Sequence, residues 1–150
     1  MVDVVSPAVR SAMMSSIRGR DTKPELAVRR YLHGLGFRYR LHLKSLPGSP
    51  DIVLPKYRVV ILIHGCFWHR HRGCKYCATP STNIAKWTEK FESNIARDER
   101  NLQRLREQNW RMVVIWECGL KHGDPAEALS WLPDVVRDFG IEYVEWPSLS

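Results

Sequence analysis

The sequence predicts an α/β fold in which helices flank a mixed β-sheet. Two runs rich in β-branched residues, YRVVILIHG at 57–65 and WRMVVIWE at 110–117, predict buried strands. Residues 84–108 lie between them and predict one long helix, because apolar side chains repeat at helical spacing and form one stripe, Trp87, Phe91, Ile95, Leu102 and Leu105. Strands separated by a helix, with shorter elements on either side, favour a single mixed sheet. A chain of 150 residues fits one such domain.

The first part of the chain predicts two helices. Residues 7–17 predict a short helix, which a basic turn at 18–20 follows. Thr22 and Glu25 have the spacing of a helix capping box, with Pro24 in the first turn, so a second helix is expected to begin at DTKPEL. Its apolar face is expected to hold Val28, Leu32 and Leu35.

Two shorter strands are expected before the first long one. FRYRLHLK at 37–44 alternates between apolar and polar residues, which predicts a strand with one basic face. That face would carry Arg38, Arg40, His42 and Lys44. The turn LPGSP then places Asp51 at the start of a short apolar strand, DIVLP.

The C-terminal region predicts a helix and a last strand. Asp124 and Pro125 have the order of a helix N-cap and first helical residue. Pro133 is expected to break or kink this helix, and IEYVEW at 141–146 predicts an edge strand.

The charge of the chain is uneven. Residues 1–80 hold 14 Lys and Arg against 4 Asp and Glu, a net charge of +10, whereas residues 81–150 hold 9 against 12, a net charge of −3, which gives the total of +7. This distribution favours a polyanionic partner, nucleic acid first, although a merely soluble basic surface would look the same. No signal peptide is apparent, and the apolar run at 59–63 is too short to span a membrane. We therefore expect a soluble, cytosolic protein without membrane contact.

The segment HGCFWHRHRGCKYC at 64–77 is the densest group of functional side chains. Cysteines in a reducing compartment favour a metal site over disulfides. Two zinc ligand sets are compatible with the spacing, either Cys66, Cys74, Cys77 and Cys118, or Cys66, His71, Cys74 and Cys118. In either set a structural zinc ion would tie the long loop to the end of the second long strand. The alternative is a group of inert buried thiols with surface histidines.

Four other residues are candidates for catalysis. His64 and His69 remain for proton transfer, since an imidazole titrates at about pH 6.5. Asp51 could hold Mg²⁺ together with a backbone carbonyl at the end of the neighbouring strand, and Glu25 could reach the same place. Each residue also has an ordinary structural explanation, so only their convergence would indicate catalysis.

Four segments, DTKPEL, LPGSPDIVLPKYRVVILIHGCFWHRH, KWTEKFESNIARDER and WRMVVIWEC, together resemble the very-short-patch repair endonucleases. These are bacterial DNA mismatch nickases related to type II restriction enzymes, and the resemblance covers residues from about 6 to about 120. It implies a restriction-endonuclease-like core with a structural zinc site. It also implies Mg²⁺-dependent cleavage of one strand of double-stranded DNA, 5′ to the thymine of a T·G mismatch that arises by deamination of 5-methylcytosine.

The resemblance also implies an organisation of the chain. A single endonuclease domain at 1–150 would comprise a DNA-contacting arm at 1–20, a catalytic core at 21–120, and a C-terminal helix and edge strand at 121–150. We expect a monomer in the bacterial cytoplasm, associated with the nucleoid. Mismatch repair proteins are the partners that the family suggests.

Roles can be carried over onto the matching residues. The implied catalytic residues are Asp51, His69, His64, Glu25 and Asp98, where Asp98 would orient His69. The implied Mg²⁺ ligands are Asp51 and the backbone carbonyl of Ile63, and the implied Zn²⁺ ligands are Cys66, His71, Cys74 and Cys118. The residues expected to contact DNA are Phe67, Trp68, Trp87, Met14, Arg18, Arg20, Lys23 and Lys90.

An aromatic wedge is also expected from the residues themselves. Phe67 and Trp68 form an apolar pair in an arginine-bearing loop, and inserting such rings between bases is easiest at a mismatched step. The alternative is that Trp68 covers the edge of the sheet.

The sequence departs from the family pattern at three points. Ile63 replaces a threonine of some members, Gly73 lengthens the gap between His71 and Cys74, and the second half of the usual restriction-enzyme motif is missing near His64. Two other functions are considered, a non-catalytic zinc DNA-binding module and a restriction-like endonuclease for other DNA substrates.

Overall fold

The computed structural model of the chain describes residues 21–148. The helix predicted at 7–17 and the candidate DNA contacts Met14, Arg18 and Arg20 lie outside these residues. Within them, the five strands of one sheet are β1 Arg40–Leu41, β2 Ile52–Leu54, β3 Val59–His64, β4 Arg111–Trp116 and β5 Tyr143–Trp146, in that spatial order. The pairs β1–β2 and β2–β3 are antiparallel, whereas β3–β4 and β4–β5 are parallel. The predicted mixed sheet is therefore confirmed.

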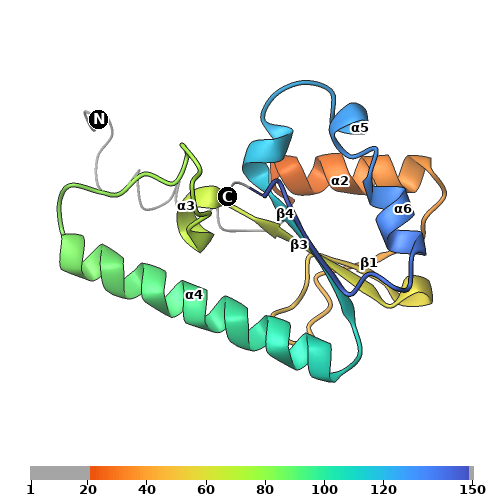
Figure 1. Cartoon of the computed structure of the whole chain (residues 1–150), viewed down its shortest axis with the longest axis horizontal. Coiled ribbons are helices and arrows are strands. Elements are labelled where there is room, and N and C mark those ends of the chain that lie inside the picture. The colour runs from red at the N-terminus through yellow and green to blue at the C-terminus, as the bar shows by residue number, and fades with distance from the viewer. Residues whose placement is uncertain (1–20, 149–150) are drawn as a thin grey trace.

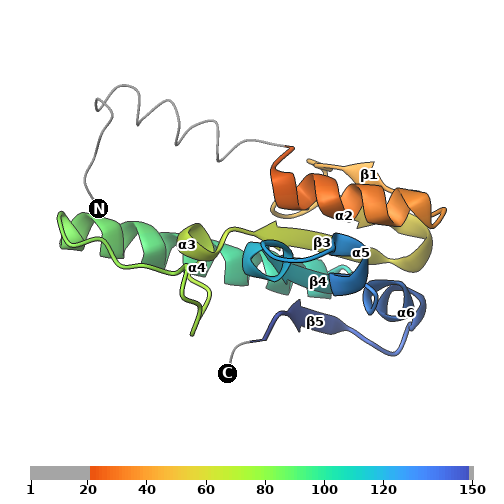
Figure 2. The same ribbon diagram turned by 90° about the horizontal axis from the view of Figure 1, so that it is seen from above.

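Helices cover both faces of this sheet (Figure 1). On one face lie α2 Lys23–Gly34, α5 Pro125–Ala128 and α6 Leu132–Arg137, and on the other lies the long helix α4 Ile84–Glu107. Figure 1 shows the sheet between these two layers, and Figure 2, seen from above, shows β1, β3, β4 and β5 following one another across the sheet. Three short elements connect the strands and helices, namely the 3₁₀ turns η1 Pro55–Tyr57 and η2 Glu117–Leu120 and the single-turn helix α3 Cys66–His69. None of the described helices is long and apolar enough to cross a membrane.

The long strands are apolar on both sides because helices pack against both. Ile61 of β3 and Ile115 of β4 face the cluster that α2, α5 and α6 form, and both are fully buried. Their neighbours Val60 and Met112 point the opposite way, towards Leu105 of α4. Successive side chains of a strand alternate between the two faces of the sheet. A strand that helices cover on both faces is therefore apolar along its whole length.

The strand predicted at 37–44 is wrong over most of its length. Only Arg40 and Leu41 pair with β2, and Leu41 is exposed rather than part of an apolar face. His42 takes a left-handed backbone conformation with φ 48°, which ends the alternation and turns its side chain inward. His42 therefore does not belong to a solvated basic face, although Arg38, Arg40 and Lys44 are exposed.

Two predicted helix faces also differ from the structure. Val28 and Leu32 of α2 are fully buried, but Leu35 follows the helix end and is 48% exposed. Along α4, Ile95 is 38% exposed, and the polar Asn94 takes the inward position beside Phe91 in the helical repeat. The side chain of Asn94 is needed there for a hydrogen bond to α3, described below, so tertiary structure overrides the apolar pattern.

The sheet topology brings five elements to one edge. Because β2 runs antiparallel to β3, the residue that starts β2 lies beside the residues that end β3. The first turn of α2 and the middle of α4 reach the same edge from opposite faces, and η2 follows the end of the parallel strand β4. The candidate residues, far apart in the sequence, therefore meet at this edge.

Candidate active site and metal centre

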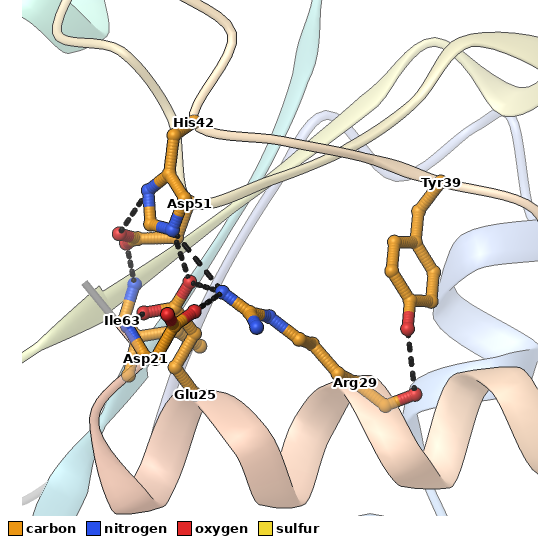
Figure 3. Close-up of polar contacts among 7 residues, drawn as sticks. All are labelled: Asp21, Glu25, Arg29, Tyr39, His42, Asp51 and Ile63. Atoms are coloured by element: carbon orange, nitrogen blue, oxygen red, sulfur yellow. Dashed lines mark hydrogen bonds and ion pairs between the residues drawn. The ribbon is translucent and has the colours of Figure 1, made fainter.

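Asp51 lies at the start of β2 with its carboxylate against β3. Its Oδ2 accepts a hydrogen bond of 2.7 Å from the backbone N–H of Ile63 (Figure 3). Burial raises the pKa of Asp51 to about 6, an effect that the hydrogen bond from Ile63 partly offsets and the nearby charge of Glu25 reinforces. A carboxylate whose ionised form is disfavoured by burial gains most from a bound cation, so the position suits a divalent metal ion.

Glu25 is directed into the same site from the first turn of α2, where it is 2% exposed. It does not close the predicted capping box, since Thr22 makes no side-chain cap and Oε2 of Glu25 accepts from the N–H of Asp21 instead. Its Oε1 contacts Arg29 at 2.5 Å and Nε2 of His42 at 2.7 Å. The carboxylate is thus held at both oxygens, and the side chain faces the cleft rather than the helix end.

His64, His69 and Asp98 form a second group at the end of β3. The two imidazole rings stack with centroids 4.0 Å apart and planes 5° apart. Nδ1 of His69 lies 2.5 Å from Oδ2 of Asp98, which reaches across from α4. Because the carboxylate occupies Nδ1, the ring is oriented and Nε2 is left for a reacting group, as in an oriented general base.

The environment keeps the ring of His64 neutral and the carboxylate of Asp98 ionised. Burial and the neighbouring charge of His69 lower the pKa of His64 to about 3, so this ring is neutral, and its buried Nδ1 has no hydrogen-bond partner among the residues described. Burial acts to raise the pKa of Asp98, but the hydrogen bond and charge of His69 outweigh it and lower the pKa overall. Asp98 is therefore an ionised carboxylate that holds the imidazole of His69.

An open cleft of about 940 Å³ joins these groups. Its wall contains all five predicted catalytic residues, Glu25, Asp51, His64, His69 and Asp98. Lys23 and Lys90 also line it, and both are exposed. A cleft that combines acid–base groups with lysines is suited to an anionic substrate of considerable size.

The predicted wedge residues are more buried than the residues of an unpacked loop would be. Phe67 and Trp68 lie on α3, half-buried, with their ring centroids 5.1 Å apart. Phe67 packs against Trp87 and Phe91 of α4, and Trp68 packs against Trp87, with ring centroids 5.2–5.9 Å apart. Phe67 and Trp68 line the cleft, whereas Trp87 does not. The four rings form one aromatic cluster beside the catalytic groups, so any wedge rests on a preformed support.

Residues that the sequence did not single out complete the site. Nδ2 of Asn94 donates to the carbonyl of Trp68, and Oε1 of Glu117 accepts from the N–H of Cys66, so both hold α3 in place. Arg29 and His42 hold Glu25. Two sequence features could have indicated these residues. Arg29 follows Glu25 by four positions, the spacing of an ion pair on a helix, and Asn94 is a polar residue within the apolar stripe. No local pattern reveals His42, because its position depends on the left-handed backbone.

The Cys and His side chains gather behind α3. The potential ligand atoms of Cys66, His71, Cys74 and Cys118 all lie within 4.8 Å of one another. Cys77 is not part of this set, although it packs against the same cluster. Of the two quartets allowed by the sequence, the geometry therefore assembles the one with three cysteines and His71.

His71 is prepared to coordinate through Nδ1. Its Nε2 lies 3.1 Å from the carbonyl oxygen of Pro147, which can only accept, so the proton is on Nε2. The lone pair of Nδ1 then faces the sulfur atoms of Cys118 at 3.5 Å and Cys66 at 3.7 Å. Burial raises the pKa of the Cys66 and Cys118 thiols, so their thiolates require a compensating cation. Such a donor set and its outer hydrogen bond fit a tetrahedral structural metal ion.

The cleft, with its acid–base groups and lysines, has the features of an enzyme site for an anionic substrate. Comparison with known proteins gives the family. The model of the DNA mismatch endonuclease Vsr family matches residues 2–75. The DNA mismatch endonuclease Vsr of Escherichia coli (strain K12) is 44% identical over 121 residues, which are 81% of this chain and 77% of that protein.

Two nicking enzymes are similarly related. The type II nicking enzyme V.XorIIP of Xanthomonas oryzae pv. oryzae is 45% identical over 128 residues, 85% of this chain and 93% of the relative. The type II nicking enzyme V.NmeAIP of Neisseria meningitidis serogroup A is 43% identical over 122 residues, 81% of this chain and 86% of the relative. The chain belongs to the Vsr family of DNA mismatch endonucleases.

Proposed function

We propose that this protein is a Mg²⁺-dependent endonuclease that nicks one strand of double-stranded DNA 5′ to the thymine of a T·G mismatch. The observation that carries the proposal is the cleft, which contains Asp51, the His69–Asp98 pair and the aromatic side chain of Trp68. Membership of a family of mismatch endonucleases supports the same reaction. The physiological role would be to start very short patch repair where 5-methylcytosine has been deaminated.

The residues of the chain have distinct parts in the proposed hydrolysis. Asp51, with the backbone carbonyl of Ile63, would hold Mg²⁺, which when bound neutralises charge on the phosphate and favours ionisation of water. His69 accepts the proton of the attacking water at Nε2, while Asp98 keeps the ring in place at Nδ1. The oxygen of that water forms the new bond to phosphorus as one P–O bond of the backbone breaks, and the leaving oxygen takes up a proton from solvent. Neutral His64, stacked on His69, fixes the ring plane without adding charge.

The zinc ion has a structural part in this proposal. Cys66, His71, Cys74 and Cys118 would bind it and so fix the segment that carries α3 relative to β4. We further propose a restriction-endonuclease-like topology for the core of the chain and action as a monomer. We also propose that the protein acts in the bacterial cytoplasm, at the nucleoid, together with mismatch repair proteins.

Mismatch selectivity would come from the aromatic cluster. Phe67 and Trp68, supported by Trp87, would enter the base stack. Unstacking costs about a few kcal/mol per step and costs least at a mismatched step. Lys23 and Lys90, which line the cleft, would neutralise phosphates of the DNA. Arg18 and Arg20, which lie outside the described residues, would have the same role.

A strand-labelled cleavage assay tests the proposal. Duplexes with T·G, T·A and C·G pairs in one sequence context are incubated with the zinc-loaded protein, with and without Mg²⁺. We expect a nick 5′ to the thymine of the T·G duplex only when Mg²⁺ is present, and its loss in Asp51→Ala with DNA binding largely retained. Cleavage of matched DNA at equal rate would indicate a restriction-like enzyme instead. Binding without cleavage under any condition would indicate a non-catalytic zinc module.

A further inference from the structure

One nitrogen of Arg29 lies at the centre of a cluster beside Asp51. Nη2 of Arg29 is 2.6 Å from Oδ1 of Asp21, 2.5 Å from Oε1 of Glu25 and 3.1 Å from Nε2 of His42. Figure 3 shows these three side chains converging on the end of the guanidinium group. The guanidinium Nε is buried and has no hydrogen-bond partner among the described residues, so Nη2 carries the contacts with the cluster.

The three surrounding residues have the composition and size of a metal site. One ligand atom from each of Asp21, Glu25 and His42 lies within 4.8 Å of the others. Two carboxylates and an imidazole, placed at this separation without a cation, would repel each other through the two negative charges. Nη2 lies among these atoms, where a metal ion would otherwise be expected.

The position matters because the cluster adjoins the proposed catalytic carboxylate. Nδ1 of His42 lies 3.9 Å from Oδ1 of Asp51, and the backbone N–H of His42 donates to the carbonyl of Asp51. Nε2 of His42 lies 2.7 Å from Oε1 of Glu25, the same oxygen that Arg29 contacts. Glu25 Oε1 is therefore occupied twice from the protein, which leaves it poorly placed to bind a metal ion directly.

We propose that Arg29 is a built-in cation that takes the place of a divalent metal ion between Asp21, Glu25 and His42. Arg29 and His42 are thereby positioning residues, because they hold Glu25 beside Asp51 without letting it become a direct metal ligand. The guanidinium is suited to this part because it stays charged. Burial acts against that charge, but hydrogen bonds with Asp21 and Glu25 outweigh burial and raise the pKa of Arg29.

The contact through one nitrogen gives the proposal a specific consequence. If Arg29 acts as a point charge, a lysine at the same position should replace it, because an ammonium group is also a point charge. A methionine of similar length leaves the three ligands without a cation. Arg29→Met should therefore create a divalent metal site that the wild-type protein does not have.

Equilibrium binding of Mn²⁺ tests this consequence directly. Zinc-loaded protein is titrated with Mn²⁺ in the absence of DNA and chelator, and free Mn²⁺ is measured by electron paramagnetic resonance. We expect Arg29→Met to bind one more Mn²⁺ per chain than the wild type, and Arg29→Lys to bind the same number as the wild type. The double variant Arg29→Met/Glu25→Gln should lose the additional site, because the ligand set is then incomplete.

Tyr39→Phe is the matched control. The hydroxyl of Tyr39 donates to the backbone carbonyl of Arg29, so this variant removes a bond to the same residue without touching the cluster (Figure 3). Its Mn²⁺ count should equal that of the wild type. An unchanged count in folded Arg29→Met, or an additional Mn²⁺ in Arg29→Lys, would overturn the proposal. If Arg29→Met folds only when Mn²⁺ is present, the metal replaces the guanidinium and the proposal is supported; if Mn²⁺ does not restore folding, the proposal is wrong.

Nicking kinetics separate this inference from the proposed function, on which its catalytic part rests. With Mg²⁺ and T·G DNA we expect Arg29→Met to lower kcat about 10-fold or more with little change in KM, and Arg29→Lys to recover most of kcat. Wild-type protein that fails to nick would contradict the proposed function while leaving the Mn²⁺ count valid. Wild-type nicking with equal kcat in Arg29→Met would contradict only the positioning role.

Discussion

At the scale of single residues, the site combines carboxylates in two different electrostatic states. Burial raises the pKa of Asp51 to about 6, whereas the bond to His69 lowers the pKa of Asp98 despite burial. Asp98 has a close side-chain partner in His69, whereas Asp51 accepts a hydrogen bond from the backbone N–H of Ile63 and has His42 3.9 Å away. The difference explains why Asp51 suits an added metal ion and Asp98 suits the orientation of an imidazole.

The raised pKa of Asp51 predicts a conflict between stability and activity. The ionised carboxylate destabilises the folded state as the pH rises from the unfolded value of 3.8 to the folded value of about 6. Asp51→Asn keeps an acceptor for Ile63 and removes this charge. We therefore expect Asp51→Asn to be about 1–2 kcal/mol more stable than the wild type at about pH 8, and no more stable below about pH 4.

Thermal unfolding in Mg²⁺-free buffer measures this difference, without chelator so that zinc is retained. Added Mg²⁺ should raise the Tm of the wild type but not of Asp51→Asn, which should also lack Mg²⁺-dependent nicking. Equal stabilisation of both proteins by Mg²⁺ would mean that Asp51 is not a metal ligand.

At the scale of elements, the short helix α3 connects the metal centre, the catalytic group and the aromatic cluster. Cys66, Trp68 and His69 are consecutive or nearly so in one helical turn, so each points in a different direction. Cys66 faces the metal ligands, His69 faces Asp98, and Trp68 packs on α4. A single turn has too few backbone hydrogen bonds to be stable alone, so its position depends on these contacts.

The position of Trp68 on α3 predicts its effect on selectivity. Trp68→Ala should reduce the ratio of kcat/KM for T·G over T·A duplexes by about 10-fold or more, while general DNA affinity changes less, because the ring would act only where a step opens. Competition assays with both duplexes measure the ratio. Trp131→Ala removes a half-buried indole on the opposite face of the sheet and should lower stability without altering the ratio. An equal loss on both duplexes in Trp68→Ala would rule out the wedge.

The geometry of the metal centre predicts a difference between two cysteines. Cys74→Ser should lose zinc and unfold at a lower temperature, since Cys74 is one of the four converging side chains. Cys77→Ser should retain one zinc per chain, because Cys77 only packs against the cluster. Elemental analysis and thermal unfolding of the two variants provide the comparison. Zinc loss in Cys77→Ser as well as in Cys74→Ser would favour the all-thiolate set.

At the scale of the whole molecule, the C-terminal segment completes the metal centre. The carbonyl of Pro147 accepts from His71, and β5 is joined to the rest of the sheet only through β4 in the described residues. Gly119, next to the ligand Cys118, has no room for a side chain, since an added Cβ would lie 2.5 Å from the ring of Trp146. Trp146 and Pro147 therefore pack as one unit with the candidate metal ligands.

This packing predicts an effect of a single methyl group. Gly119→Ala should displace Trp146 and Pro147, cost about 1–3 kcal/mol of stability and speed the release of zinc to a chelator, because the bond that orients His71 is weakened. Gly34→Ala is the control, since an added Cβ at the end of α2 meets nothing within 4 Å. If Gly119→Ala releases zinc at the wild-type rate, the C-terminal segment does not stabilise the metal centre and the prediction is wrong.

The long elements could be predicted because their patterns are local. The strands β3 and β4, the helix α4 and the mixed sheet follow from continuous apolar runs and helical spacing, which burial on two faces enforces. The short segment at 37–44 could not be predicted in the same way. Two of its residues pair, and the left-handed backbone of His42 is stabilised by contacts with Glu25 and Asp51, which no local pattern records.

By itself, the sequence determined the class of the fold, the catalytic candidates and the residues from which a metal site could be built, because residue type fixes which side chains can bind protons or metal ions. Only the tertiary structure decided between Cys77 and His71 as the fourth converging side chain, and only it placed Arg29 and His42 around Glu25. The physical reason is distance. Coordination and charge pairing act over a few ångströms in space, and the strand order and the left-handed turn at His42 set which distant residues come that close.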